Sequence, residues 1–161
     1  MSPPGFVYPH ALPWNGPRPW FLHPTAGIAH NWALDFMAPG GTYVVAPEAA
    51  TISRWSGHDP KLGEILDDHG RPTSVYGWSM YLHTRTGIIY FLTHLDRRYA
   101  KVGDTVRAGD LIGRVGHWPK NEGRSHSHLG VTHPRGETEA KAYIKRVANA
   151  IRVNVRGQGQ L

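Results

Sequence analysis

Two histidines separated by one residue stand in the stretch 124–131, which reads RSHSHLGV. Polar and apolar residues alternate there, which predicts a β-strand, and positions i and i+2 of a strand point to the same face. His126 and His128 would therefore present their imidazoles side by side, an arrangement that suits a metal site or an acid–base pair. Random placement of 11 histidines in 161 residues gives about 0.7 such pairs, so the pair alone is weak evidence.

Two other segments supply a carboxylate and further histidines. His30 and Asp35 lie five residues apart, and their side chains would converge on one ion if the chain between them turned. The same spacing also fits an aspartate in a turn next to an unrelated surface histidine. His94 follows the apolar run 88–93 (IIYFLT), where a predicted strand reaches the rim of a sheet, and a buried structural histidine is the alternative interpretation.

The composition limits the class of protein. The chain has no cysteine, which excludes disulfides and thiolate ligands, so any metal must be held by His, Asp or Glu. A net charge of +6 and a pI of about 9.8 favour a polyanionic environment: nucleic acid, anionic membrane or cell-wall polymer. The basic residues are scattered, so we expect no nucleic-acid partner. We also expect no signal peptide and no membrane insertion.

The elements that must position these residues are predicted to be mostly strands, as the 19 glycines and 13 prolines also indicate. Two strands joined by a Pro-Glu turn are expected over 42–46 and 50–56, and hairpins over 78–93 and 102–116. We further expect a strand from 126 to about 133, loops over 57–76 and 117–125, and a helix over 137–153 with apolar residues at i, i+3 and i+4. In the 78–93 hairpin and its continuation Tyr90, Leu92 and His94 are expected to share a face. His10 and His23 are predicted to be structural, and His58 and His69 to lie on the surface.

We expect three parts in one folded unit, since 161 residues suit a single domain. Residues 1–29 are predicted to form an extended N-terminal arm packed on the domain. Residues 30–134 would form the catalytic domain, and residues 135–161 a C-terminal helix and tail.

Taken together and in this order, the segments resemble the lysostaphin-like zinc endopeptidases, peptidase family M23, which cut peptidoglycan peptides. The resemblance runs from about His23 to Pro134. It rests on HPTAG at 23–27, HNWALDFMAPGGTYVVA at 30–46, THL at 93–95, VGDTVRAGDLIG at 102–113 and HSHLGV at 126–131. Each motif is weak alone, and five in the same order are strong. The family usually spaces its first His and Asp by four positions, whereas the gap here is five.

The resemblance implies a mainly β fold, an antiparallel β-sheet groove with long loops, plus a C-terminal α-helix. It implies Zn²⁺ as the cofactor, held by His30, Asp35 and His128, with His94 and His126 as the pair that activates water or stabilises the oxyanion. We prefer His126 as the general base and His94 as the electrostatic partner. The implied activity is hydrolysis of peptide bonds in bacterial peptidoglycan, at glycine bridges or at a D-Ala linkage.

A wall-cutting enzyme without a signal peptide would reach its substrate as a phage lysin. We expect either a virion component with tail or baseplate partners, or an endolysin released to the cell wall during lysis. One alternative, kept open by the five-residue gap, is a catalytically inactive wall-binding or structural virion module on the same fold. Another is a non-haem iron oxygenase with a two-His-one-carboxylate triad, which the 102–113 hairpin fits poorly.

Overall fold

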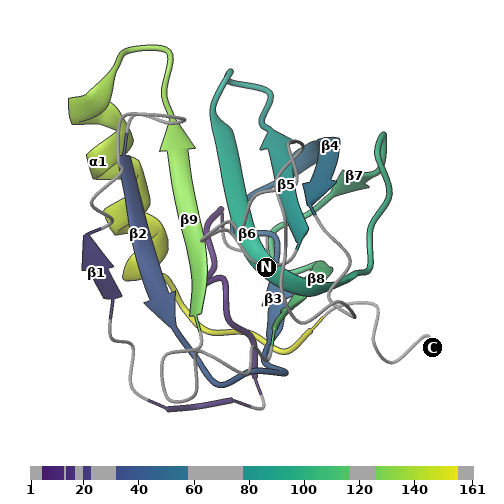
Figure 1. Cartoon of the computed structure of the whole chain (residues 1–161). Coiled ribbons are helices and arrows are strands. Elements are labelled where there is room, and N and C mark those ends of the chain that lie inside the picture. The colour runs from purple at the N-terminus through teal and green to yellow at the C-terminus, as the bar shows by residue number, and fades with distance from the viewer. Residues whose placement is uncertain are drawn as a thin grey trace, which may run out of the picture.

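The computed structural model describes residues 5–12, 14–16, 20–22, 32–57, 78–116 and 126–155. Within these ranges the chain forms one helix and an antiparallel sheet of nine strands (Figure 1). The elements are β1 (Trp20–Leu22), β2 (Trp32–Met37), β3 (Tyr43–Val45), β4 (Ala50–Gly57), β5 (Trp78–His83), β6 (Ile89–Arg98), β7 (Thr105–Val106), β8 (Leu111–Val115), β9 (His126–Thr132) and α1 (Glu137–Ala148). The predicted mainly β fold with a C-terminal helix is confirmed.

The sheet brings strands together that are far apart in the sequence. Its order is β1-β2-β9-β6-β5-β4-β7, while β8 pairs with both β6 and β3. The strand that carries the His-x-His pair, β9, therefore lies between β2 and β6, which carry Asp35 and His94. This placement makes a site from three separate sequence segments possible.

Alternation along the strands separates a core face from an open face. Leu82, Tyr90 and Leu92 are fully buried, as period-2 patterning requires of residues that face a core. The helix α1 lies beside β2 and β9 and covers this core face with Ala140, Ile144, Val147 and Ala148 (Figure 1). The opposite face of β2, β9 and β6 holds four of the predicted site residues: Asp35, His94, His126 and His128.

The chain after α1 differs from the sequence prediction. The helix ends at Ala148 and not at Val153, because Asn149 caps it with both its backbone N–H and its side-chain amide on Lys145 O. The following residues run beside the N-terminal arm, where Tyr8 N donates to Ile151 O (2.8 Å) and Leu12 N to Val153 O (2.9 Å). Ile151, which was expected on the last helical turn, thus forms a β-bridge with Val7 of the arm.

The predicted 102–116 hairpin is also wrong, although both of its strands exist. β7 pairs with β4, and β8 pairs with β3 and β6, so the two strands do not pair with each other. The predicted strands at 42–46, 50–56 and 78–84 correspond to β3, β4 and β5. The predicted loops at 57–76 and 117–125 lie almost wholly outside the described residues. Within the described ranges no helix is long and apolar enough to cross a membrane.

Candidate functional site

Asp35 and His128 face each other across two neighbouring strands. They are direct partners in the β2–β9 register, so both side chains project from the same face. His128 Nδ1 lies 3.1 Å from Asp35 Oδ1. The His128 side chain is 3% exposed and that of Asp35 is 21% exposed, so the pair is sheltered but open on the carboxylate side.

Two further imidazoles stand beside this pair. His126 Nε2 lies 3.9 Å from the same Asp35 Oδ1, as expected for a residue two positions from His128 on one strand face. The ring centroid of His94 lies 4.7 Å from that of His126 and 6.5 Å from that of His128. We call Asp35, His94, His126 and His128 the His–Asp cluster.

His94 reaches the cluster through an irregularity in β6. Trp78 pairs with Leu95 while Met80 pairs with Leu92, so β6 has one residue more than β5 in this interval, which is a β-bulge. His94 adopts a left-handed φ of 69°, which is uncommon for a residue other than glycine. The prediction that His94 shares a face with Tyr90 and Leu92 is therefore wrong, because the bulge turns His94 to the open face. His94 also lies within β6 and not at its end.

The geometry of Asp35 and His128 fits two ligands of one metal ion. In a tetrahedral zinc site with ligands at about 2.0–2.1 Å, two donor atoms lie about 3.3 Å apart, which is close to the 3.1 Å between His128 Nδ1 and Asp35 Oδ1. The third predicted ligand, His30, lies outside the described residues. Among the residues that the structure describes, no group of three His, Asp or Glu is arranged to hold a metal ion.

The open face continues from the cluster over an aromatic pair that sequence reasoning missed. The ring of Phe91 lies 5.8 Å from that of His128, and the ring of Tyr81 lies 4.9 Å from that of Phe91. Thr93, the partner of His128 on β6, accepts a hydrogen bond from Ser79 on β5 (2.7 Å). Alternation does place Phe91 opposite Tyr90, but the link to His128 requires the β6–β9 register.

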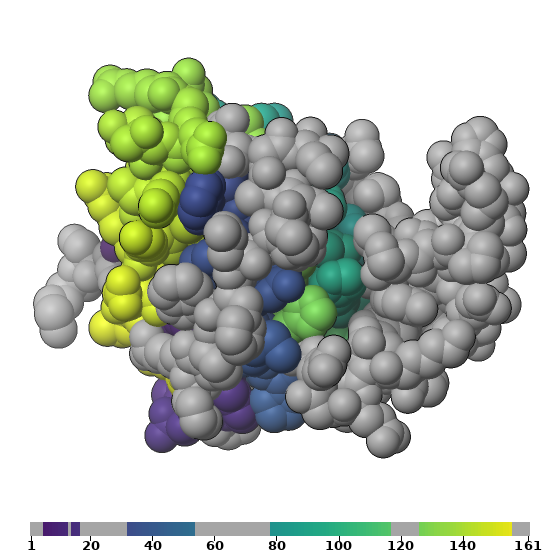
Figure 2. All heavy atoms as spheres, turned by 60° about the vertical axis from the view of Figure 1, so that its left-hand side comes forward, coloured from purple at the N-terminus to yellow at the C-terminus, as the bar shows by residue number. Residues whose placement is uncertain are grey.

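The space-filling view is consistent with an accessible face. In Figure 2, green atoms of β9 are visible between the blue atoms of β2 and the teal atoms of the strands beyond, while α1 lies to the side. The aromatic pair adjoins the His–Asp cluster on this face, since the ring of Phe91 lies beside that of His128.

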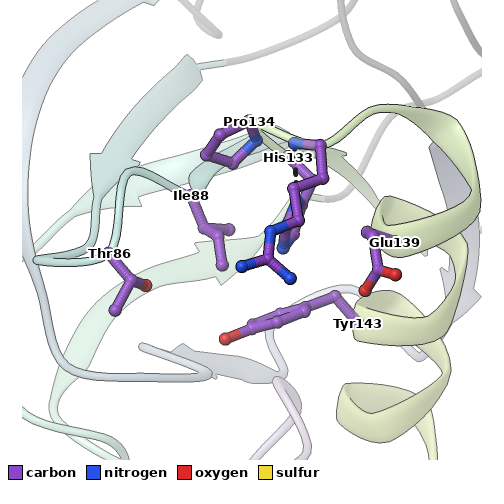
Figure 3. Close-up of a pocket in the computed structure, with 7 residues that line it drawn as sticks. Thr86, Ile88, His133, Pro134, Glu139 and Tyr143 are labelled. Carbon is purple, nitrogen blue, oxygen red and sulfur yellow. Dashed lines mark hydrogen bonds between the residues drawn. The ribbon is translucent and has the colours of Figure 1, made fainter.

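A second hollow of about 330 Å³ lies at the opposite end of β9, about 20 Å of strand away from His126. It lies between the 84–88 turn, the β9–α1 connection and α1. Figure 3 shows Tyr143 and Glu139 of α1 facing Thr86 and Ile88 across it. The hollow is lined by one carboxylate, Glu139, and one imidazole, His133. The His–Asp cluster brings one carboxylate and three imidazoles together, so it is the better candidate for chemistry.

Burial perturbs two carboxyl or imidazole groups outside the cluster. Burial, together with the nearby charges of Arg152 and His126, lowers the pKa of His10 to about 3. Burial raises the pKa of Glu48 to about 6, and a hydrogen bond from Tyr90 opposes this shift. Neither His10 nor Glu48 belongs to the His–Asp cluster, and the shift of each pKa comes first from burial.

An antiparallel sheet that presents a buried histidine against an aspartate, with two more imidazoles beside them, carries side chains of the kinds that bind metal ions or transfer protons in catalytic sites. The model of Peptidase family M23 matches residues 29–141, well over half of the chain, and the chain belongs to this family. A search of the curated proteins found no match.

Solved structures show the same fold. A protein provisionally assigned as the glycyl-glycine endopeptidase LytM from Ruminococcus gnavus is 19% identical, with a TM-score of 0.56 over 92% of this chain and 62% of its own. A zinc-containing peptidase from Vibrio cholerae is also 19% identical (TM-score 0.55; 80% of this chain, 37% of its own). The solution structure of lysostaphin, a peptidase from Staphylococcus simulans, is 19% identical as well, with a TM-score of 0.52 over 89% of this chain and 56% of its own. The chain thus spans less than two thirds of each.

Proposed function

We propose that this protein is a zinc-dependent endopeptidase that hydrolyses peptide bonds in bacterial peptidoglycan. The observation that supports this most directly is the 3.1 Å approach of His128 Nδ1 to Asp35 Oδ1 on the open face of the sheet. Membership of Peptidase family M23 supports the reaction class. The aromatic pair beside the cluster and the basic charge of the chain suit a peptide held within an anionic wall polymer.

The proposed metal ligands are His30, Asp35 and His128. Two imidazoles and one carboxylate are a ligand set of catalytic zinc sites, which keep one position open. A bound Zn²⁺ supplies Lewis acidity, which polarises a carbonyl and lowers the pKa of a coordinated water to about 7. Asp35 and His128 hold their donor atoms close together through the β2–β9 register, so little rearrangement is needed to share an ion.

His126 and His94 are the proposed acid–base and electrostatic groups. His126 stands on the same strand face as His128, and its Nε2 lies 3.9 Å from Asp35 Oδ1, so its imidazole lies next to the proposed ligands and can take a proton from a water molecule there. His94 projects from β6, which flanks β9 on the side away from β2. Its ring centroid lies 4.7 Å from that of His126, and from this position it can donate a hydrogen bond to a developing oxyanion. Each role would contribute about 10²- to 10⁴-fold in rate.

The test uses purified protein and isolated cell walls. We expect bound zinc in the wild type, release of free amines from the walls, and loss of both in His128→Ala and Asp35→Ala. His133→Ala is the matched control, because it removes a histidine at the far end of β9 and should retain zinc and activity. Hydrolysis that persists in both site variants and in chelator would refute the proposal. Wall binding without zinc or hydrolysis would indicate the inactive-module alternative.

The setting of the activity stays a prediction. We propose a phage lysin, either carried in the virion with tail or baseplate partners or released at lysis as an endolysin. Mass spectrometry of purified particles separates these two settings, since only the first predicts a constant number of copies per particle.

A further inference from the structure

A buried imidazole lies directly behind the His–Asp cluster. His10 is fully buried, and its Nε2 lies 2.7 Å from Ser127 Oγ, which is fully buried as well. Ser127 stands between His126 and His128 on β9, so its side chain points to the core face while theirs point to the open face. The hydrogen bond therefore holds the strand segment that carries both site histidines.

His10 also packs against the strand that carries Asp35. Phe36 is the direct partner of Ser127 in the β2–β9 register, and it is adjacent to Asp35 in sequence. The ring of His10 meets that of Phe36 edge-on, with the centroids 6.3 Å apart. One side chain thus contacts β2 and β9 at the position where they bring Asp35 and His128 together.

The position of His10 is itself fixed by both flanks of the chain. On the arm, Ala11 N donates to Tyr43 O (3.0 Å) and Val45 N to Pro9 O (2.9 Å), which fixes the backbone around His10 to β3. The ring of Trp14 lies 5.9 Å from that of His10.

Arg152 then connects this arrangement to the C-terminal flank. Its guanidinium stacks 4.5 Å from the Trp14 ring centroid and donates to Trp14 O and Gly16 O. Residues 5–16 and 151–155 both lie outside the family match at 29–141.

We propose that His10 is a positioning residue for the peptidase site, which holds β9 through Ser127 so that His126 and His128 keep their places opposite Asp35. The inference rests on the proposed function for its kinetic consequence. A displacement of about 1 Å in a catalytic group costs about 10²-fold in rate, and a strand fixed from behind by a buried hydrogen bond resists such a shift. Burial lowers the pKa of His10 to about 3, so the imidazole is neutral at the pH of an assay and offers one donor and one acceptor nitrogen.

The variants separate the hydrogen bond from the volume of the side chain. His10→Leu and Ser127→Ala each remove one partner, and the double variant removes both. His10→Gln keeps a hydrogen-bonding group at this position. Tyr90→Phe is the matched control, because it removes a different buried hydroxyl whose hydrogen bond, to Glu48, does not involve β9.

The full chain is assayed for kcat and KM on cell walls, for zinc affinity by chelator competition, and for the ring NMR signals of His126 and His128 without metal. We expect His10→Leu and Ser127→Ala to lose about tenfold in kcat and in zinc affinity, with KM unchanged and both ring signals shifted. His10→Gln should recover most of the loss. The double variant should regain thermal stability, because neither polar group is left unpaired, and should stay slow.

Wild-type kcat, zinc affinity and ring signals in both single variants would overturn the proposal. The proposal would also be overturned if Tyr90→Phe lost as much kcat as the His10 and Ser127 variants for the same loss of thermal stability, because the loss would then reflect stability alone. If the wild type proves inactive on cell walls, the proposed function fails, but the NMR signals of the His126 and His128 rings still test the positioning role of His10. Unshifted signals of both rings in both single variants would then overturn that positioning role.

Discussion

Mild acid should destabilise this protein through a single buried histidine. Burial first, and then the charges of Arg152 and His126, lower the pKa of His10 from 6.5 to about 3. In the unfolded chain His10 takes up a proton near pH 6.5, whereas in the folded chain it stays neutral until far lower pH. Between these values the unfolded state binds more protons, so the free energy of unfolding falls as the pH falls.

The magnitude follows from linkage. A single group of this kind contributes about 1.4 kcal/mol per pH unit within its window. From pH 7.5 to pH 4.5 the expected loss assigned to His10 is about 2.5 kcal/mol, a large share of the 5–15 kcal/mol typical of a domain. The contribution is fully present above pH 6.5 and is lost as the pH falls toward the pKa of about 3 in the folded state.

The assay is urea unfolding of the wild type and His10→Gln at several pH values, with chelator present so that metal release does not contribute. Subtracting the two curves cancels the titration of the other groups, and the variant should lose about 2.5 kcal/mol less than the wild type between pH 7.5 and 4.5. His133→Gln is the matched control. Its free energy of unfolding should fall between pH 7.5 and 4.5 as steeply as that of the wild type, because His10 is still present. Parallel curves for the wild type and His10→Gln would refute the reasoning.

Three further changes test other parts of the structure. Glu48→Gln should stabilise the protein at pH 8 and not at pH 4 in urea unfolding: burial raises the pKa of Glu48 to about 6, so ionisation above that pH opposes folding, by up to about 1 kcal/mol after solvent screening. Gly113→Ala should cost about 1–3 kcal/mol in the same assay, because a Cβ there would lie 2.8 Å from Leu95 Cδ1 and 3.3 Å from Arg97 O. His94→Val should lower the melting temperature more than His94→Asn, because asparagine tolerates a φ of 69° and a β-branched residue does not. Both variants should abolish hydrolysis. Equal melting temperatures of the two variants would contradict the argument from backbone strain.

Local patterning predicted the strands and the β5–β6 hairpin over 78–93, but not which strands far apart in the sequence lie side by side. The His126–His128 strand and the burial of Tyr90 and Leu92 follow from period-2 alternation, which is a property of each segment alone. The approach of Asp35 to His128 depends on β9 lying beside β2, and 92 residues separate these two positions in the chain. Only the motif order, through the resemblance to the family, indicated that they meet.

The register of β6 could not be predicted because a bulge changes it. Strict alternation puts His94 with Tyr90 and Leu92 in the core, and a single additional residue in β6 reverses its face. One class of β-bulge has a glycine in the left-handed conformation, which can be recognised in a sequence, but here His94 itself adopts that conformation. A strained backbone at a residue of the cluster is what functional sites tend to show, since surrounding structure must hold such a conformation.

The flanks of the chain show how a family core depends on segments outside it. The last helical turn was predicted to continue to Val153, but the helix ends at Ala148 and the residues after it hydrogen-bond to the N-terminal arm. The two segments hydrogen-bond to each other, and the N-terminal one also to β3. Their combined contact places His10 next to Ser127, and a hydrogen bond 2.7 Å long then links the described flanks to the beginning of β9. A change near either terminus can therefore reach the His–Asp cluster without touching the open face.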